Sequence, residues 1–76
     1  MNIEISDIQY WKRMAYYDGV LYCSLLEIYG KTDWRMPTID EMGDKRYGLQ
    51  WYRDDGDNHG DYKLSEVYWI IPVRDI

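Results

Sequence analysis

The chain has 76 residues, with 14 acidic and 9 basic side chains and a formal net charge of -5. This length predicts one domain, residues 1–76, and leaves little room for both a core and a deep enzymatic cleft. The acidic balance argues against direct nucleic-acid binding, which requires a surplus of Lys and Arg. Because 46% of the residues are hydrophobic, a disordered tail is also excluded.

The N-terminus and the cysteine content bear on the compartment. Cys23 is the only cysteine, so no internal disulfide can form, which favours a reducing cytoplasm. The first fourteen residues contain Glu4 and Asp7 and no apolar run, unlike a signal peptide. No apolar stretch approaches the roughly 20 residues that cross a bilayer. We expect a cytoplasmic protein without a membrane partner.

Residues 2–17 carry two patterns in succession. Ile3 and Ile5 alternate with polar residues, which predicts a short strand. Three apolar residues then follow at helical spacing: Ile8, Trp11 and Ala15. Ser6 and Gln9 have the spacing of a capping box, so a helix is expected after the strand.

Residues 18–30 predict a second helix. Its apolar residues recur at helical spacing: Leu21, Leu25 and Ile28. Asp18 is the expected N-cap and Gly30 the expected residue just past the C-terminus. The face that contains these apolar residues is expected to lie against the core.

The segment after residue 30 contains a helix-start signal. Thr38 is followed three residues later by Glu41, the pattern of a capping box, and Pro37 and Met42 have the spacing of a hydrophobic staple. A short helix over about residues 39–45 is expected.

The C-terminal part alternates like two strands around a polar turn. Residues 48–53 and 63–71 are the expected strands of a β-hairpin, and the loop between them is rich in Asp and Gly. Pro72 is expected at a strand end, edge or bulge. The elements predict an α+β fold, with N-terminal helices packed on a short antiparallel sheet and a C-terminal hairpin.

Catalytic patterns are weak. Cys23 and His59 are the only thiol and imidazole; Cys23 lies in an apolar helix pattern and His59 in a turn, which favours structural roles over a nucleophile pair. Two such groups are too few for a zinc site, and no phosphate-binding glycine loop occurs. We expect no enzymatic activity and no cofactor other than, as an alternative, calcium.

The Asp-rich loop supports three interpretations. Asp55, Asp57 and Glu66 fall at the first, third and twelfth positions of an EF-hand-like spacing, with Gly60 at the sixth. The positions of His59, Tyr62 and Lys63 depart from that pattern, so a solvated hairpin turn is the first interpretation and a calcium site the alternative. The cluster of Asp54, Asp55, Asp57 and Asp61 also allows DNA mimicry, in which carboxylates imitate phosphates.

The aromatic residues comprise nine Tyr and four Trp, without Phe. Tyr and Trp combine apolar area with a polar tip and are enriched in interfaces. Three tryptophans are expected in the core: Trp11, Trp34 and Trp69. The predicted binding residues cluster around the hairpin: Trp51, Tyr52, Asp54, Asp55, Asp57 and Tyr62.

The pattern YC-x2-L-x3-G-x2-DWRMPT-x2-EM, over residues 22–42, resembles the signature of the Lcl C-terminal domain family. The matching positions are Tyr22, Cys23, Leu26, Gly30, Asp33, Trp34, Arg35, Pro37, Thr38 and Glu41. Met36 and Met42 stand where members of that family usually have Leu. More weakly, the Tyr68-Trp69 and Val73-Arg74 pairs resemble its closing strand.

The resemblance implies a C-type-lectin-like fold that serves as a binding scaffold. Asp33, Trp34, Arg35, Pro37, Thr38 and Glu41 then have scaffold roles. In these roles Trp34 fills the core and Arg35 pairs with backbone carbonyls or with a carboxylate such as Asp33. Because these are scaffold roles, the motif does not locate a ligand site. The chain also departs from the family pattern, since it lacks the loop-rich β half of most members.

The leading hypothesis is a small acidic protein, encoded by a phage or mobile element, that binds a host protein in the cytoplasm and inhibits or modulates it. One alternative is a lectin-like module for a carbohydrate or a cation-dependent ligand, and another is the DNA mimic. A homodimer is left open, since small domains often gain stability by self-association.

Overall fold

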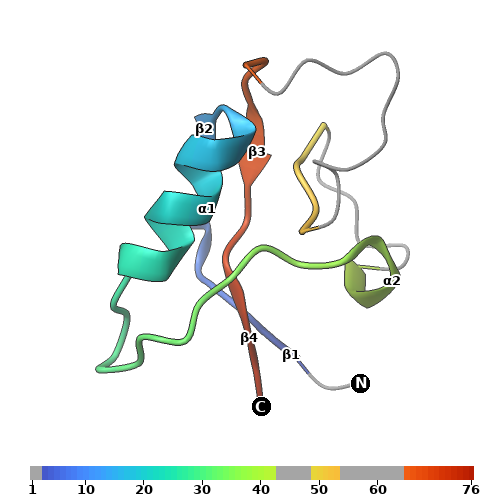
Figure 1. The fold of residues 1–76 in the computed structure, drawn as a ribbon. Coiled ribbons are helices and arrows are strands. Elements are labelled where there is room, and N and C mark those ends of the chain that lie inside the picture. The colour runs from blue at the N-terminus through green and yellow to red at the C-terminus, as the bar shows by residue number, and fades with distance from the viewer. Residues whose placement is uncertain (1–2, 43–48, 54–64) are drawn as a thin grey trace.

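The structure is a computed structural model that describes residues 3–42, 49–53 and 65–76. Its elements, in chain order, are β1 (Ile3–Ile5), the 3-10 turn η1 (Ile8–Tyr10), β2 (Lys12–Met14), α1 (Tyr16–Leu25), α2 (Ile39–Met42), β3 (Tyr68–Ile70) and β4 (Val73–Asp75). Helices and short antiparallel strands are both present, as an α+β class requires (Figure 1). No helix in these three ranges is long and apolar enough to cross a membrane.

The two ends of the chain form the sheets together. β1 pairs antiparallel with β4, with Ile3 opposite Asp75, and β2 pairs antiparallel with β3, with Lys12 opposite Ile70. Figure 1 shows β1 and β4 side by side near the C-terminal end of the chain. Pro72 lies between β3 and β4, as expected for a residue that cannot donate to a strand ladder.

β1 confirms the predicted N-terminal strand, but the helix expected after it is wrong. Residues 8–10 form one 3-10 turn, and β2 follows where the helical spacing continues. The Ser6–Gln9 capping box does not form, since the Ser6 hydroxyl has no partner among the described residues while its N–H donates to Pro72 O at 3.0 Å. The pairing of β2 with β3 is a tertiary interaction, so the spacing of apolar residues within this segment does not predict it.

α1 confirms the second predicted helix and corrects its orientation. The helix begins at Tyr16, with Ala15 rather than Asp18 at the N-cap, and buries Tyr16, Gly19 and Cys23. The expected core residues Leu21 and Leu25 are exposed instead. The reason is that Gly19 has no side chain, so the helix approaches Ile70 of β3 along that face.

Gly30 is part of a tight turn rather than a helix end. Ile28 and Lys31 exchange two backbone hydrogen bonds of 3.1 and 3.0 Å around Tyr29 and Gly30. Both central residues have positive φ, 56° and 76°, which is typical of a two-residue hairpin turn and suits glycine at one of them. Ile28 is buried, as expected, but it lies beyond the helix.

The expected C-terminal antiparallel hairpin is wrong for the residues that the structure describes. Gln50 forms a parallel bridge with Trp69: Trp51 N donates to Trp69 O, and Trp69 N donates to Leu49 O, each at 3.0 Å. The other edge of β3 pairs with β2, so residues 49–51 take the remaining edge. The polar loop between the two predicted strands lies mostly in residues 54–64, outside the described residues.

The core lies between α1 and the strands. It is built from Tyr16, Cys23, Met36, Trp51 and Ile70. The indole of Trp51 meets the rings of Tyr16 and Tyr68, with centroids 5.4 and 4.8 Å apart. Trp34 is buried, as predicted, while Trp11 and Trp69 are half-buried.

Candidate functional site

The 33–38 segment is held against β4 by its backbone and by charge. Arg35 N donates to Val73 O at 2.7 Å, and Val73 N donates to Arg35 O at 2.8 Å. The indole N–H of Trp34 donates to Lys31 O at 3.0 Å, which orients the ring into the core. The segment also lies against α1, because Met36 belongs to the same core cluster as Tyr16 and Cys23 of that helix.

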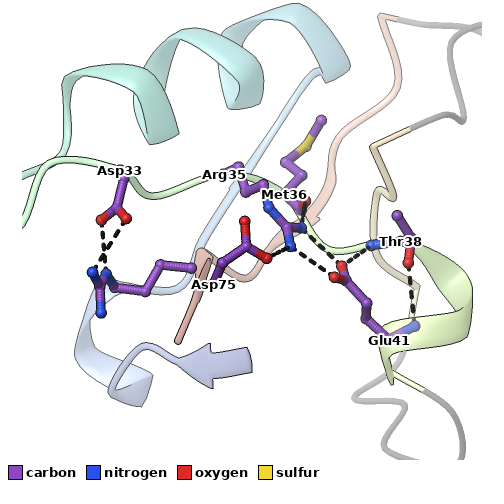
Figure 2. A network of polar contacts seen from close by, with 7 residues as sticks. Asp33, Arg35, Met36, Thr38, Glu41 and Asp75 are labelled. Carbon is purple, nitrogen blue, oxygen red and sulfur yellow. Dashed lines mark hydrogen bonds and ion pairs between the residues drawn. The ribbon is translucent and has the colours of Figure 1, made fainter. Parts of the chain in front are cut away.

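Thr38 and Glu41 form the predicted capping box at the start of α2. Glu41 N donates to Thr38 Oγ1 at 3.2 Å, and Thr38 N donates to Glu41 Oε1 at 2.8 Å (Figure 2). Two backbone N–H groups that the short helix cannot pair internally are thus satisfied. The expected start of the helix at residue 39 is confirmed.

Arg35 pairs with Glu41 and Asp75 instead of the suggested Asp33. Its two terminal nitrogens contact both Glu41 oxygens at 2.8 and 2.7 Å, and one of them donates to Asp75 at 2.7 Å (Figure 2). Its other predicted partner type, a backbone carbonyl, is present as Met36 O at 3.1 Å. The guanidinium lowers the pKa of Glu41 to about 2, and the two carboxylates raise the pKa of Arg35.

Asp33 pairs with Arg74 of β4. Arg74 donates to the two Asp33 oxygens at 2.7 and 3.2 Å and to Glu4 at 3.1 Å. This ion pair lowers the pKa of Asp33 and raises that of Arg74. Together the two arginines join β1, β4 and the 33–41 region, a structural role that agrees with the scaffold roles expected for the motif.

The structure describes two of the predicted binding residues, Trp51 and Tyr52. Trp51 is only 1% exposed and donates from Nε1 to Met14 O at 3.1 Å, so its prediction as an interface residue is wrong. Tyr52 is half-buried. The remaining predicted binding residues, Asp54, Asp55, Asp57 and Tyr62, lie outside the described residues, as does His59.

The calcium hypothesis rests largely on residues that are not described. Of its three ligands, only Glu66 is placed, and it accepts a hydrogen bond from the Tyr68 hydroxyl. Within residues 3–42, 49–53 and 65–76, no three His, Cys, Asp or Glu side chains group closely enough to hold a metal ion. The cluster considered for DNA mimicry, including Asp61, is likewise not described.

Cys23 does not have the environment of a nucleophile. Its side chain is buried in the core on the inner face of α1, and burial raises the pKa of the thiol to about 12. A thiol with such a pKa is protonated at neutral pH, and the thiolate is the reactive form. The structural role predicted for this residue agrees with its position.

The outer face of α1 is a stripe of exposed apolar side chains. We name it the α1 apolar face and define it by Tyr17, Val20, Leu21 and Leu25, which are 65%, 44%, 58% and 74% exposed. Tyr17, Leu21 and Leu25 are four residues apart, so they form one row along the helix, and Val20 lies beside it. Figure 1 shows this helix at one side of the molecule.

The sequence carried a signal for this face that the periodicity argument missed. The helix YYDGVLYCSL is apolar around most of its circumference, a pattern typical of a helix buried on more than one side. The structure buries one side of it and leaves the other exposed. A face of this kind on a small domain is typical of an interaction surface.

Searches against protein-family models, curated proteins and solved structures find no match to this chain, so the resemblance to the Lcl C-terminal domain family stays a prediction.

Proposed function

We propose that this chain is a non-enzymatic binding protein that covers a surface of another protein with its α1 apolar face. The observation that carries the proposal is the exposure of Tyr17, Leu21 and Leu25 in one row. Covering such a row removes apolar area from water, which is the main favourable contribution in protein association. Binding of this kind inhibits or modulates the partner by occupying its surface.

The arrangement of the face favours a helix or a ridged surface as the partner. The row of Tyr17, Leu21 and Leu25 runs parallel to a second row, formed by Val20 and Ser24. Rows of this four-residue spacing interdigitate with the same rows of a second helix. We further propose a C-type-lectin-like scaffold, supported by the DWRMPT segment and its capping box, and a cytoplasmic site of action, supported by the single, buried thiol.

The experiment compares three proteins as baits in a bacterial lysate. The wild-type chain is expected to retain a stoichiometric partner, and Leu21→Glu/Leu25→Glu is expected to lose it because two charges interrupt the apolar row. Leu49→Glu is the matched control, since Leu49 is 65% exposed and lies on the segment paired with β3. Circular dichroism verifies that all three are folded.

Retention of the same partner by the double variant would overturn the proposal. Sedimentation of the purified chain adds a second criterion. If the wild-type chain is a dimer and Leu21→Glu/Leu25→Glu is a monomer, the face is covered by a second copy of this chain and not by a different protein.

A further inference from the structure

A hollow adjoins the α1 apolar face. Its floor is formed by three buried side chains, Cys23, Trp34 and Met36, and its rim includes the exposed residues Val20 and Arg53. Val20 belongs to both the hollow and the α1 apolar face, so the two form one continuous surface. The hollow has a volume of about 190 Å³.

The size and lining of the hollow suit one bulky apolar side chain. An apolar cavity of about 150 Å³ accommodates a benzene molecule, so this hollow is large enough for a single ring or a branched aliphatic group. The indole of Trp34 and the thioether of Met36 offer the polarisable contacts that aromatic groups favour.

The charge at the rim comes from Arg53. Within the described residues, the guanidinium of Arg53 has no ion-pair or hydrogen-bond partner, although its backbone is fixed by Pro37 O and by the Tyr16 hydroxyl. The other described arginines are engaged: Arg35 with Glu41 and Asp75, Arg74 with Asp33 and Glu4, and Arg13 over the ring of Trp69.

Arg35 also lines the hollow, but its charge is already compensated. Two carboxylates contact it, so this group adds no attraction for a further anion. Arg53 is therefore the cation that a ligand at this hollow would meet, and the complementary group is a carboxylate adjacent to the apolar group.

We propose that the hollow receives one bulky apolar side chain of the protein partner, with a neighbouring carboxylate of the same partner segment paired to Arg53. This inference rests on the proposed function and specifies the chemistry of the partner. The partner segment presents a hydrophobic residue next to Asp, Glu or a C-terminal carboxylate. An anchor of this kind, seated in a pocket at the edge of an apolar face, is typical of a binding hot spot.

The test uses a small probe, 3-phenylpropionate, and its neutral analogue 3-phenylpropanamide. The full chain is labelled with ¹³C at the methionine methyl groups, because Met36 lines the hollow whereas Met14 and Met42 do not. At probe concentrations on the order of 10 mM, weak fragment binding is detectable. We expect the ring to shift the Met36 methyl signal selectively, and the carboxylate to bind about two- to fivefold more tightly than the amide, as for an exposed ion pair.

Arg53→Gln is expected to abolish the preference for the carboxylate without preventing binding of the amide. Arg13→Gln is the matched control, since Arg13 lines a second hollow, of about 280 Å³, with Leu49, Val67, Tyr68 and Trp69. No selective shift of Met36, equal affinity for the two probes, or the same loss in both arginine variants would overturn the proposal.

The titration and the lysate experiment fail separately. If the titration fails but capture succeeds and depends on Leu21 and Leu25, the hollow is ruled out as an anchor site and the α1 apolar face stays the binding surface. If the titration succeeds but capture fails, a protein partner is ruled out, and so is the anchor proposed here. The hollow is then a site for a small carboxylic acid.

Discussion

Arg35 and Glu41 meet through two parallel hydrogen bonds of 2.8 and 2.7 Å, and the same Glu41 carboxylate accepts the N–H of Thr38 at 2.8 Å. One side chain therefore caps α2 and neutralises the arginine that is bridged by its backbone to β4 (Figure 2). The Glu41 side chain is only 3% exposed, so this pair is shielded from solvent. Charge-assisted, bidentate contacts of this kind are stronger than ordinary hydrogen bonds.

Replacement of Glu41 by Gln is expected to lower the free energy of unfolding at pH 7 by about 1–3 kcal/mol. The folded-state pKa of Glu41 is lowered to about 2 from 4.5. Its contribution is therefore fully present above about pH 4.5 and is lost as the pH falls towards 2. Urea unfolding measured at pH 7 and at pH 2.5 should show a large difference between wild type and Glu41→Gln at the first pH and a small one at the second. An equal difference at both would contradict the role of the ionised carboxylate.

Asp75 provides a comparison on the same arginine. Its side chain is 76% exposed, so its contact of 2.7 Å with Arg35 is screened by water. Asp75→Asn is expected to change the free energy of unfolding by less than about 0.5 kcal/mol. A loss as large as that of Glu41→Gln, in the same urea series, would mean that the exposed carboxylate holds the arginine as strongly as the buried one.

Trp51 is expected to contribute to stability rather than to binding. Its indole donates to Met14 O and contacts the rings of Tyr16 and Tyr68. Trp51→Phe leaves the part-buried Met14 carbonyl without this donor and removes part of the packing, which should cost about 1–3 kcal/mol. Thermal and urea unfolding measure this loss. If the variant kept wild-type stability and lost partner capture, Trp51 would be an interface residue, as the sequence predicts.

The elements that sequence reasoning predicted correctly are those determined by near neighbours. The alternation around Ile3 and Ile5 indicated β1, and the three-residue spacing of Thr38 and Glu41 indicated the capping box. Both signals depend on residues within a single turn or strand. The α+β class followed from the same local patterns, as did the position of Pro72.

The errors arose where a distant partner decides the structure. Lys12 opposes Ile70, and Gln50 opposes Trp69, and these pairings of remote segments overrode a helical spacing and an expected hairpin. The orientation of α1 follows from the absence of a side chain at Gly19. The periodicity of apolar residues gives a glycine no weight in choosing the buried face. Two apolar faces compete on that helix, and only the position of Ile70 selects which of them is buried.

Gly19→Ala is expected to destabilise the fold even though Ala favours helices. A Cβ at this position would lie 2.2 Å from Ile70 Cδ1 and 2.7 Å from its Cγ1, and Ile70 is fully buried. Overpacking of this kind costs about 1–3 kcal/mol, which exceeds the helix-propensity gain of up to about 1 kcal/mol. Ser24→Ala, on the exposed side of the same helix, should be neutral or slightly stabilising. Unfolding midpoints that rank Gly19→Ala above wild type would show that α1 does not approach β3 so closely.

Cys23 is expected to react with iodoacetamide only when the chain opens. With a pKa of about 12, the folded thiol supplies almost no thiolate at pH 8, and its burial excludes the reagent as well. Mass spectrometry should therefore show slow alkylation of the native chain and a rate that rises with urea in step with the unfolded fraction.

The raised pKa of Cys23 also implies that stability falls as the pH rises above about 9, because the unfolded thiol then loses its proton while the folded one keeps it. Alkylation of the native chain at the rate of an unfolded peptide would instead indicate an accessible thiolate. Cys23 would then be a candidate nucleophile.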